Sequence, residues 1–333
     1  MSESIQKLTH VEHILKRPDS YVGPVSRVGE QYWVKEGEGF EKKTVIYAPA
    51  LLKIFDEILV NAIDRNSLYP KQVTSISVKI DREKGEISIE NNGPLGGIEV
   101  KEHEKEKIWN PELTFGHLLT STNYDDSQQR VVGGRNGYGA KLTNVYSSKF
   151  SIKIKDSENK TTYTQEWSNN MKTCGKPKMR SYAGATSSVC ITFTPDWSRF
   201  GMSAMDDHIF KIFEKRVYDA NICTTHGCKI KFQGEALPKT AFSDYARMHT
   251  KSDEVCLCMS DRWSVCVVPS EDGFEQVSFV NGICTTKGGS HVDHVAGILA
   301  SNIIDEMAKK IKLKPQQVKN SFMVFVRATL VNP

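Results

Sequence analysis

The sequence predicts an α+β protein of two consecutive domains, and three observations support this. The chain of 333 residues is long enough for two hydrophobic cores of ordinary size. Up to residue 233, short alternating strands follow helices and pair through hairpin turns, which favours a mixed sheet with helices on one face. From Gly234 onward, a strand, a loop, a helix and another strand follow in order, which is the pattern of a crossover unit. We therefore expect an N-terminal arm (1–25), a first domain (26–233) and a second domain (234–333).

The composition narrows the class of protein. Hydrophobic residues make up 39% and charged residues 25% of the chain, as in globular proteins. No apolar run approaches the roughly 18 residues of a membrane span, so we expect no membrane segment. The net charge of +4 permits a nucleic-acid partner without arguing for one. The eight cysteines have no paired metal spacing, which predicts reduced thiols rather than disulfides or a zinc site.

The elements before residue 49 are short. The sequence predicts a helix at 11–15, a turn bracketed by Pro18 and Gly23, and strands at 32–34 and 44–47 around a charged loop at 35–43.

The central element is a helix that begins at Pro49 and carries Glu57 and Asn61. Apolar residues recur at helical spacing at positions 55, 58, 59, 62 and 63. Glu57, Asn61 and Asp64 project from one side of this helix. Two interpretations stay open at this point. The three residues form a solvated polar face, or a carboxylate activates water beside an amide oxygen that ligates a hard cation such as Mg²⁺.

A hairpin of two strands, at 75–80 and 86–90, follows this helix. The second strand runs into Asn91, Asn92 and Gly93. A glycine at a strand end lets the backbone approach a ligand closely, but a plain surface turn explains it equally well.

Four glycines within residues 133–139 precede Lys141 and an apolar helical pattern. A glycine-rich loop that leads into a helix suits phosphate oxygens, because backbone N–H groups converge there and the helix dipole adds positive potential. Neither the Walker A spacing nor the G-x-G-x-x-G spacing is present, since no glycine follows Gly137 and Gly139 at the expected downstream position. A flexible loop without a ligand remains the alternative.

The other predicted elements complete the two domains. In the first domain they are a helix at 113–119, strands at 150–155, 161–167, 188–194 and 229–233, and a helix at 205–219. In the second they are a helix at 242–248, a hairpin of 255–259 and 263–268, a strand at 276–280, a helix at 292–310 and a strand at 321–330. Lysines 309, 310, 312 and 314 form a basic cluster at the end of the 292–310 helix, as a solvated helix end or as a nucleic-acid contact.

Six motifs occur in one unbroken order along the chain. They are residues 17–23, 57–62, 91–93, 119–126, 134–141 and 278–291. Together they resemble the ATPase and transducer domains of eukaryotic-type DNA topoisomerase II. The resemblance implies a GHKL (Bergerat) α/β sandwich followed by a ribosomal-S5-like α/β transducer domain that is incomplete at its C-terminal end.

The resemblance also implies roles for individual residues. Glu57 would be the general base that polarises the attacking water, and Asn61 would hold Mg²⁺ at the phosphates of ATP. Asn91 would read the adenine amino group. Ser121, Thr122 and Asn123 would contact the ribose and the base. The triphosphate would be wrapped by Gly134, Arg135, Asn136, Gly137, Tyr138, Gly139, Ala140 and Lys141, with Lys141 offsetting its charge.

The sequence departs from the family pattern in three places. The segment 94–97 is longer than in relatives, which leaves open whether Gly96 or Gly97 contacts a ligand. Ile5 stands where relatives often carry an aromatic residue, in an arm that commonly exchanges between subunits. The family's Gln-Thr-Lys loop and its cleavage tyrosine would follow Pro333, so we expect weak or absent hydrolysis by this stretch alone.

For the full-length enzyme, the resemblance implies an ATP-driven gate. ATP binding would close a homodimer around double-stranded DNA, for strand passage in relaxation and decatenation. Lys309, Lys310 and Lys312 would contact that DNA without sequence preference. A nuclear location is implied and an organellar form stays open. The alternatives are another GHKL ATPase, MutL- or Hsp90-like, or a nucleotide-binding dimerisation module without hydrolysis.

Overall fold

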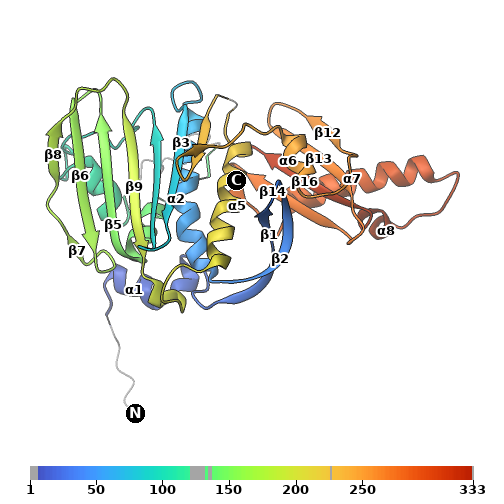
Figure 1. The fold of residues 1–333 in the computed structure, drawn as a ribbon, viewed down its shortest axis with the longest axis horizontal. Coiled ribbons are helices and arrows are strands. Elements are labelled where there is room, and N and C mark those ends of the chain that lie inside the picture. Colours follow the sequence, from blue (N-terminus) through green and yellow to red (C-terminus); the bar gives the residue numbers. More distant parts are fainter. Residues whose placement is uncertain (1–6, 121–131, 134–136, 226, 332–333) are drawn as a thin grey trace, which may run out of the picture.

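A large sheet, a second sheet and a separate two-stranded hairpin, with helices packed between the two larger sheets, make up the described part of the protein (Figure 1). The computed structural model describes residues 7–120, 132–133, 137–225 and 227–331. Within these residues, the large sheet has nine strands in the order β11-β10-β3-β4-β9-β5-β6-β7, with β8 paired to β6. Its strands are β3 (Ser75–Asp81), β4 (Glu86–Asn92), β5 (Ser147–Asp156), β6 (Thr161–Ser168), β7 (Thr173–Cys174), β8 (Lys178–Ser181), β9 (Ser188–Pro195), β10 (Lys229–Phe232) and β11 (Glu235–Ala236). The sheet is mixed as predicted, since β10 pairs with β3 in parallel while β3 pairs with β4 in antiparallel fashion.

The predicted hairpin of β3 and β4 is confirmed, with Val78 opposite Ile89 and Ile80 opposite Ile87. These side chains alternate inward, which buries one face of both strands. The sequence did not predict β7, β8 or β11. These strands are short and largely exposed, so they carry little hydrophobic pattern.

The predicted charged loop at 35–43 is wrong. Strands β1 (Val28–Glu36) and β2 (Gly39–Tyr47) continue through it and pair up to Glu36 and Gly39. Charged side chains contact each other along the hairpin, as between Lys43 and Glu36 at 2.8 Å, on the face that also carries buried Val34 and Val45. Phe40 is buried on the other face. The charged run is therefore part of a hairpin and not a loop.

Helices α2 (Pro49–Leu68) and α5 (Asp207–Cys223) lie side by side between the large sheet and the second sheet (Figure 1). The ring of Phe55 stacks on that of Phe213, with centroids 4.2 Å apart. Helix α2 begins at Pro49 as predicted. Helix α5 begins later than predicted because the side chain of Asp206 caps its N-terminus, accepting a hydrogen bond from the Ile209 N–H.

Three shorter helices flank this pair: α1 (His10–Lys16), α3 (Asn110–Gly116) and α4 (Gly139–Val145). The predicted helix at 113–119 is displaced toward the N-terminus. Pro111 occupies its first turn, and Leu119 has a left-handed backbone that no helix continues (φ 62°).

The second sheet contains five strands within the described residues, in the order β12-β13-β16-β14-β15. They are β12 (Cys256–Met259), β13 (Trp263–Pro269), β14 (Glu275–Val280), β15 (Ile283–Cys284) and β16 (Phe322–Ala328). Its helices are α6 (Phe242–Arg247), α7 (Ser290–Met307) and α8 (Pro315–Lys319), of which α8 was not predicted. Strands β14 and β16 are parallel and joined through α7, so the predicted crossover unit is confirmed.

Two further findings concern the cysteines and the lengths of the helices. All eight cysteines are free thiols. Across the part of the chain that the structure describes, no helix has the length and apolar character needed to cross a membrane.

Candidate nucleotide site

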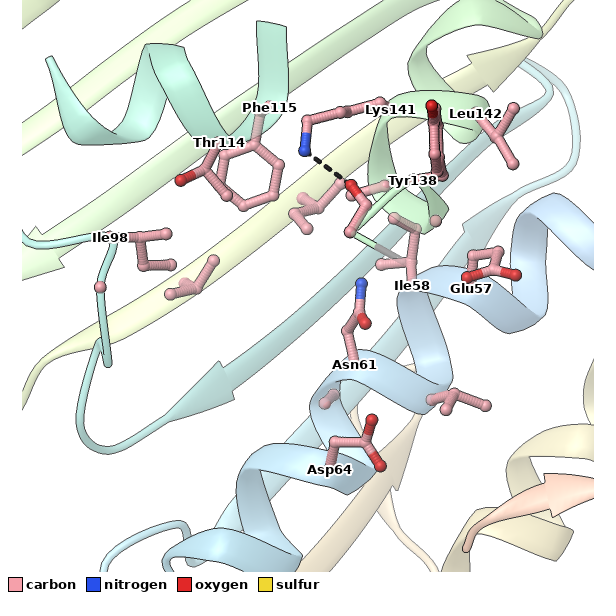
Figure 2. Close-up of a pocket in the computed structure, with 18 of the residues that line it drawn as sticks. Glu57, Ile58, Asn61, Asp64, Ile98, Thr114, Phe115, Tyr138, Lys141 and Leu142 are labelled. Carbon is pink, nitrogen blue, oxygen red and sulfur yellow. Dashed lines mark hydrogen bonds between the residues drawn. The ribbon is translucent and has the colours of Figure 1, made fainter. Parts of the chain in front are cut away.

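A cavity of about 1310 Å³ lies beside α2 (Figure 2). Its walls come from α2, the end of β4, α3, β9, the segment before α4, and β15. Small-molecule sites typically occupy roughly 300–1,000 Å³, so a nucleoside triphosphate fits in this space.

Glu57 stands at the junction of α2 and the start of α4. Its Oε1 pairs with Lys53 Nζ at 2.5 Å, one helical turn earlier. A methyl group at Gly139 would overlap Oε2 of the same carboxylate. Glycine at position 139 is therefore what lets the backbone before α4 lie directly against Glu57.

Asn61 and Asp64 follow Glu57 along α2 (Figure 2). Asn61 lines the cavity. Asp64 is buried, and its Oδ1 accepts a hydrogen bond of 3.0 Å from the Gly133 N–H. Asp64 therefore ties the glycine-containing segment to α2.

The two asparagines at the end of β4 point in opposite directions, because side chains alternate along a strand. Asn92 accepts hydrogen bonds from the N–H groups of Thr74 and Ser75, both at 2.9 Å, and so fixes the start of β3. Asn91 lines the cavity, beside Val189 of β9. Only Asn91 is placed to meet a ligand.

An apolar wall continues from Asn91. Ile89, Val189 and Ile191 come from the two paired strands, and Ile98 and Phe115 face them from the loop and from α3 (Figure 2). Flat aromatic groups bind well on such surfaces, because burial of apolar area drives their association.

Lys141 lies in the first turn of α4 and is almost fully buried. Its Nζ donates hydrogen bonds of 2.6 Å to the carbonyls of Thr120 and Gly137. Burial lowers the pKa of Lys141 to about 8. An anion in the cavity would restore the preference for the charged amine.

The long segment at 94–97 forms one rim of the cavity. Gly96 has a left-handed backbone (φ 55°), and its carbonyl accepts a hydrogen bond of 2.8 Å from Arg65 Nη2. A side chain at position 96 would collide with that guanidinium. Gly97 instead donates its N–H to Glu99 Oε1. Both glycines line the cavity, so their positions do not distinguish which one meets a ligand.

The structure brings together the predicted residues that it describes. These are Glu57, Asn61, Asn91, Gly137, Tyr138, Gly139, Ala140 and Lys141, all of which line the cavity. Ser121, Thr122, Asn123, Gly134, Arg135 and Asn136 lie outside the described residues. Lys309, Lys310 and Lys312 are exposed beyond the end of α7 and do not line the cavity.

Lys53 and Ile283 are two of the cavity residues that the sequence did not predict. Lys53 could have been found, because it precedes Glu57 by four residues on the same helix. Ile283 comes from β15 of the second domain. Nothing local in the sequence indicates that contact, because it depends on how the two domains pack.

Comparison with known proteins gives close relatives over the whole chain. DNA topoisomerase 2 of Penicillium chrysogenum is 45% identical and matches 100% of this chain and 22% of the relative. DNA topoisomerase 2-beta of Mus musculus is 44% identical and matches 98% of this chain and 21% of the relative. The chain thus spans about a fifth of the length of these curated relatives. A family profile described as DNA gyrase B matches residues 229–333.

Solved structures agree with these relatives. The ATPase region of Saccharomyces cerevisiae topoisomerase II has a TM-score of 0.92 and 39% identity, covering 99% of this chain and 87% of that one. The ATPase and transducer domains of DNA topoisomerase II from Balamuthia mandrillaris give a TM-score of 0.92 and 38% identity, covering 99% and 86%. The 43K ATPase domain of Thermus thermophilus gyrase B, at 18% identity and a TM-score of 0.60, covers 96% and 81% and supports the fold alone.

These matches confirm the predicted GHKL sandwich with a following transducer domain, and they favour topoisomerase II over a MutL- or Hsp90-like ATPase. At 39% identity over 87% of the yeast ATPase region, the chain belongs to the DNA topoisomerase II family, in which it corresponds to the ATPase region.

Proposed function

We propose that this chain binds ATP with Mg²⁺ in the cavity beside α2, and that Glu57 serves as the general base of hydrolysis. The observation that carries the proposal is the convergence of Glu57, Asn61, Asn91 and Lys141 on one cavity of sufficient volume.

The geometry around Glu57 suits a base for phosphoryl transfer to water. Its carboxylate lies against Gly139, at the start of the helix that carries Lys141. Phosphates held at that helix would lie beside the carboxylate, within reach of a water between them. Lys53, which also lines the cavity, pairs with Glu57 across one turn of α2.

The donor set fits Mg²⁺ held mainly by the nucleotide. No group of three or more His, Cys, Asp or Glu side chains that could hold a metal occurs among the described residues. Asn61 offers one amide oxygen in the cavity. Mg²⁺ typically takes few protein oxygens and completes its shell with phosphate oxygens and water, so Asn61 would hold it and the ion would supply charge neutralisation.

The two ends of the cavity suit the two ends of ATP. Asn91, beside the apolar wall, would accept a hydrogen bond from the adenine amino group without burying a charge. Ser121, Thr122 and Asn123 would contact the ribose and base. Residues 134–141 would wrap the triphosphate, and Lys141 would offset its charge.

In the whole enzyme, ATP binding would close a homodimer around a DNA duplex, and hydrolysis would reset this gate for strand passage. We expect this activity in the nucleus, because the family resemblance implies it.

The test compares full-length wild type with Glu57→Ala, using Glu166→Ala as a control for removal of an exposed acid. We expect Glu57→Ala to bind a non-hydrolysable ATP analogue normally and to lose roughly 10²–10⁴-fold in turnover. Glu166→Ala should match wild type. If Glu57→Ala and wild type turn over ATP equally, Glu57 is not the base, and if wild type binds no nucleotide, the whole proposal is wrong.

DNA contact is tested separately, by alanine substitution of Lys309, Lys310 and Lys312 together. Their exposed charges would act on phosphates, so the triple variant should bind DNA more weakly and with a shallower salt dependence. An unchanged slope would remove these three lysines from the DNA-binding surface.

A further inference from the structure

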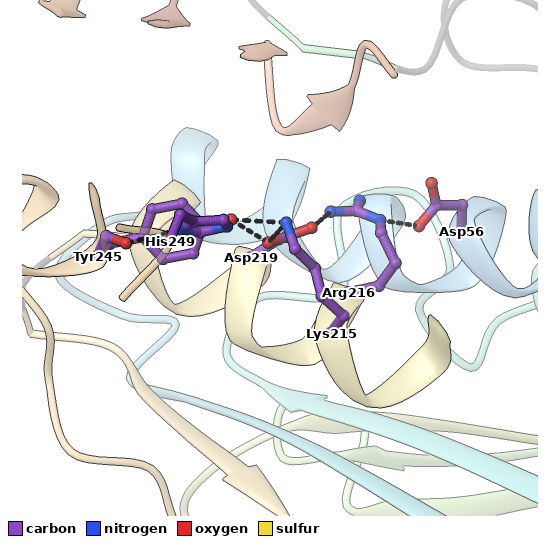
Figure 3. Close-up of polar contacts among 6 residues, drawn as sticks. All are labelled: Asp56, Lys215, Arg216, Asp219, Tyr245 and His249. Carbon is purple, nitrogen blue, oxygen red and sulfur yellow. Dashed lines mark hydrogen bonds and ion pairs between the residues drawn. The ribbon is translucent and has the colours of Figure 1, made fainter. Parts of the chain in front are cut away.

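A buried polar cluster lies between the two domains, outside the catalytic and binding groups assigned above (Figure 3). Its members come from α2, from α5, and from α6 with the turn that follows it. They are Asp56, Lys215, Arg216, Asp219, Tyr245 and His249. Asp56 immediately precedes Glu57, so the cluster begins one residue away from the proposed base.

Arg216 is the centre of the cluster and is fully buried. Its Nε donates a hydrogen bond of 2.7 Å to Asp56 Oδ1, and its Nη1 donates one of 3.0 Å to Asp219 Oδ2. Its Nη2 is buried and has no hydrogen-bond partner among the described residues. Arg216 therefore joins the helix that carries Glu57 to α5, through a guanidinium that is itself sealed from water.

Asp219 links Arg216 and α5 to the second domain through hydrogen bonds. Its Oδ1 accepts hydrogen bonds from Lys215 Nζ at 2.7 Å and from the Tyr245 hydroxyl at 2.5 Å. Burial acts to raise the pKa of Asp219, but the charges of Lys215 and Arg216 outweigh it and hold that pKa below its usual value. Two cations and two carboxylates thus balance each other inside the protein.

Tyr245 belongs to the core of the second domain. Its ring lies 6.3 Å from the rings of both Phe279 and Phe325, measured between centroids. His249 Nδ1 donates to the Tyr245 carbonyl at 2.9 Å, and burial lowers the pKa of His249 well below its usual value. The imidazole is therefore neutral, and the Tyr245 hydroxyl is the group that reaches across to the ion pairs.

Strand β15 makes a second connection between the same partners. Its first residue, Ile283, lines the nucleotide cavity, and a methyl group at Gly133 would lie 2.8 Å from it. Its next residue, Cys284, is half-buried, packs against the core of the second domain, and lies near enough to Arg216 for that charge to act on its thiol. One short strand of the second domain thus faces the cavity with one side chain and the buried cluster with the next.

We propose that Arg216, together with Asp56, Asp219 and Tyr245, is a positioning group that sets the place of Glu57 according to how the second domain packs on the first. This rests on the proposed role of Glu57. Any rotation of the second domain must either break the bond between Tyr245 and Asp219 or move α5 and α2 with it. Moving the helices is favoured, because a buried charge that loses its partner is strongly destabilising.

The test uses Tyr245→Phe in the full-length enzyme, which deletes only the hydroxyl that links the domains. Tyr163→Phe is the matched control, because that buried hydroxyl donates to Gln165 within the large sheet and away from the cluster. The readouts are affinity for a non-hydrolysable ATP analogue with Mg²⁺, kcat and KM for ATP, and amide hydrogen exchange of residues 242–247 with and without the analogue.

We expect Tyr245→Phe to bind the analogue within about twofold of wild type while kcat falls roughly tenfold or more, because small misplacements of reacting groups are costly. The change in exchange of residues 242–247 that the analogue causes in wild type should be lost. Tyr163→Phe should keep both properties. Equal kcat and equal exchange in the two variants would overturn the inference.

Failure of the proposed function gives a different result, since wild type itself would then bind no analogue. If Tyr245→Phe does not fold, Asp56→Asn takes its place, because it keeps the size and an acceptor oxygen but removes the charge that pairs with Arg216. The same lowered kcat at unchanged affinity is expected for it, and a wild-type kcat would overturn the inference.

Discussion

Two neighbouring carboxylates on α2 have ion-pair partners of opposite character. The Glu57 side chain is 21% exposed and pairs with Lys53, which is 45% exposed. The Asp56 side chain is 16% exposed and pairs with Arg216, which is 1% exposed. The difference between the two acids lies in their partners, because a mobile surface partner leaves a carboxylate free for a ligand whereas a buried partner fixes it.

The energetics of the two pairs differ accordingly. Exposed ion pairs contribute little, since water and salt screen them and the long side chains lose entropy. Breaking a buried pair leaves an unpaired charge in a medium of low dielectric. We therefore expect the cavity side of α2 to tolerate substitution in the folded state, and the interdomain side not to.

The largest effect on stability is expected from Arg216→Ala. The substitution removes the cation that pairs with Asp56 and Asp219, so the free energy of unfolding should fall by about 3–5 kcal/mol. Urea denaturation measures this. A loss below about 1 kcal/mol would mean that water enters the cluster and that the two sides of α2 are alike.

The next effect is expected from Gly139→Ala, where the added methyl group overlaps Glu57 Oε2. The overcrowding should cost about 1–3 kcal/mol of stability and should displace the carboxylate, lowering kcat. Gly297→Ala in α7 is the matched control, because its methyl group meets no neighbour and should stabilise the helix by about 1 kcal/mol. Calorimetry and ATP turnover check both, and an unaffected kcat in Gly139→Ala would separate Glu57 from this segment.

A smaller effect concerns pH and Lys141. Because its pKa in the folded protein is about 8, below that of the unfolded chain, the cost of burying its charge is constant below pH 8 and is relieved as the pH rises above it. A bound triphosphate would keep the amine charged. Nucleotide binding should therefore take up a proton near pH 8, and the affinity should fall by up to about tenfold per pH unit above it.

Calorimetric titration in two buffers of different ionisation enthalpy detects this proton. Lys141→Arg, which stays charged, should bind without it. Equal heats in both buffers for the wild type would show that Lys141 does not face the phosphates.

The smallest effect is expected from Lys53→Ala. The exposed pair with Glu57 should contribute no more than about 1 kcal/mol to the free energy of unfolding, so thermal unfolding should barely change. If Lys53→Ala lowered the free energy of unfolding as much as Arg216→Ala does, the Glu57 and Asp56 ion pairs would not differ in stability.

The sequence predicted local structure where the pattern was strong. The helix from Pro49 and the hairpin of β3 and β4 were correct because apolar residues recur there with clear periods. The sequence predicted a loop at the charged turn of β1 and β2, because a run of charged residues resembles a loop when no partner strand is known. The helix α3 was displaced because Pro111, which marks its start, was not used.

For the site, the residue types and the glycine spacing indicated candidate residues, and the family resemblance supplied their roles. The contacts that join the domains could not be predicted. Asp56 and Arg216 are 160 positions apart, and Ile283 reaches the cavity only through the packing of the second domain. Such contacts leave no periodic signal in the sequence, because each partner obeys only its own helix or strand.

The most direct test of the central claim is a structure of the protein with a non-hydrolysable ATP analogue and Mg²⁺. We predict the adenine beside Asn91, the metal ion on the Asn61 amide oxygen, and a water between Glu57 and the γ-phosphate. A nucleotide bound elsewhere, or a Glu57 carboxylate turned away from the γ-phosphate with no water between them, would contradict the assignment of this cavity and of its base.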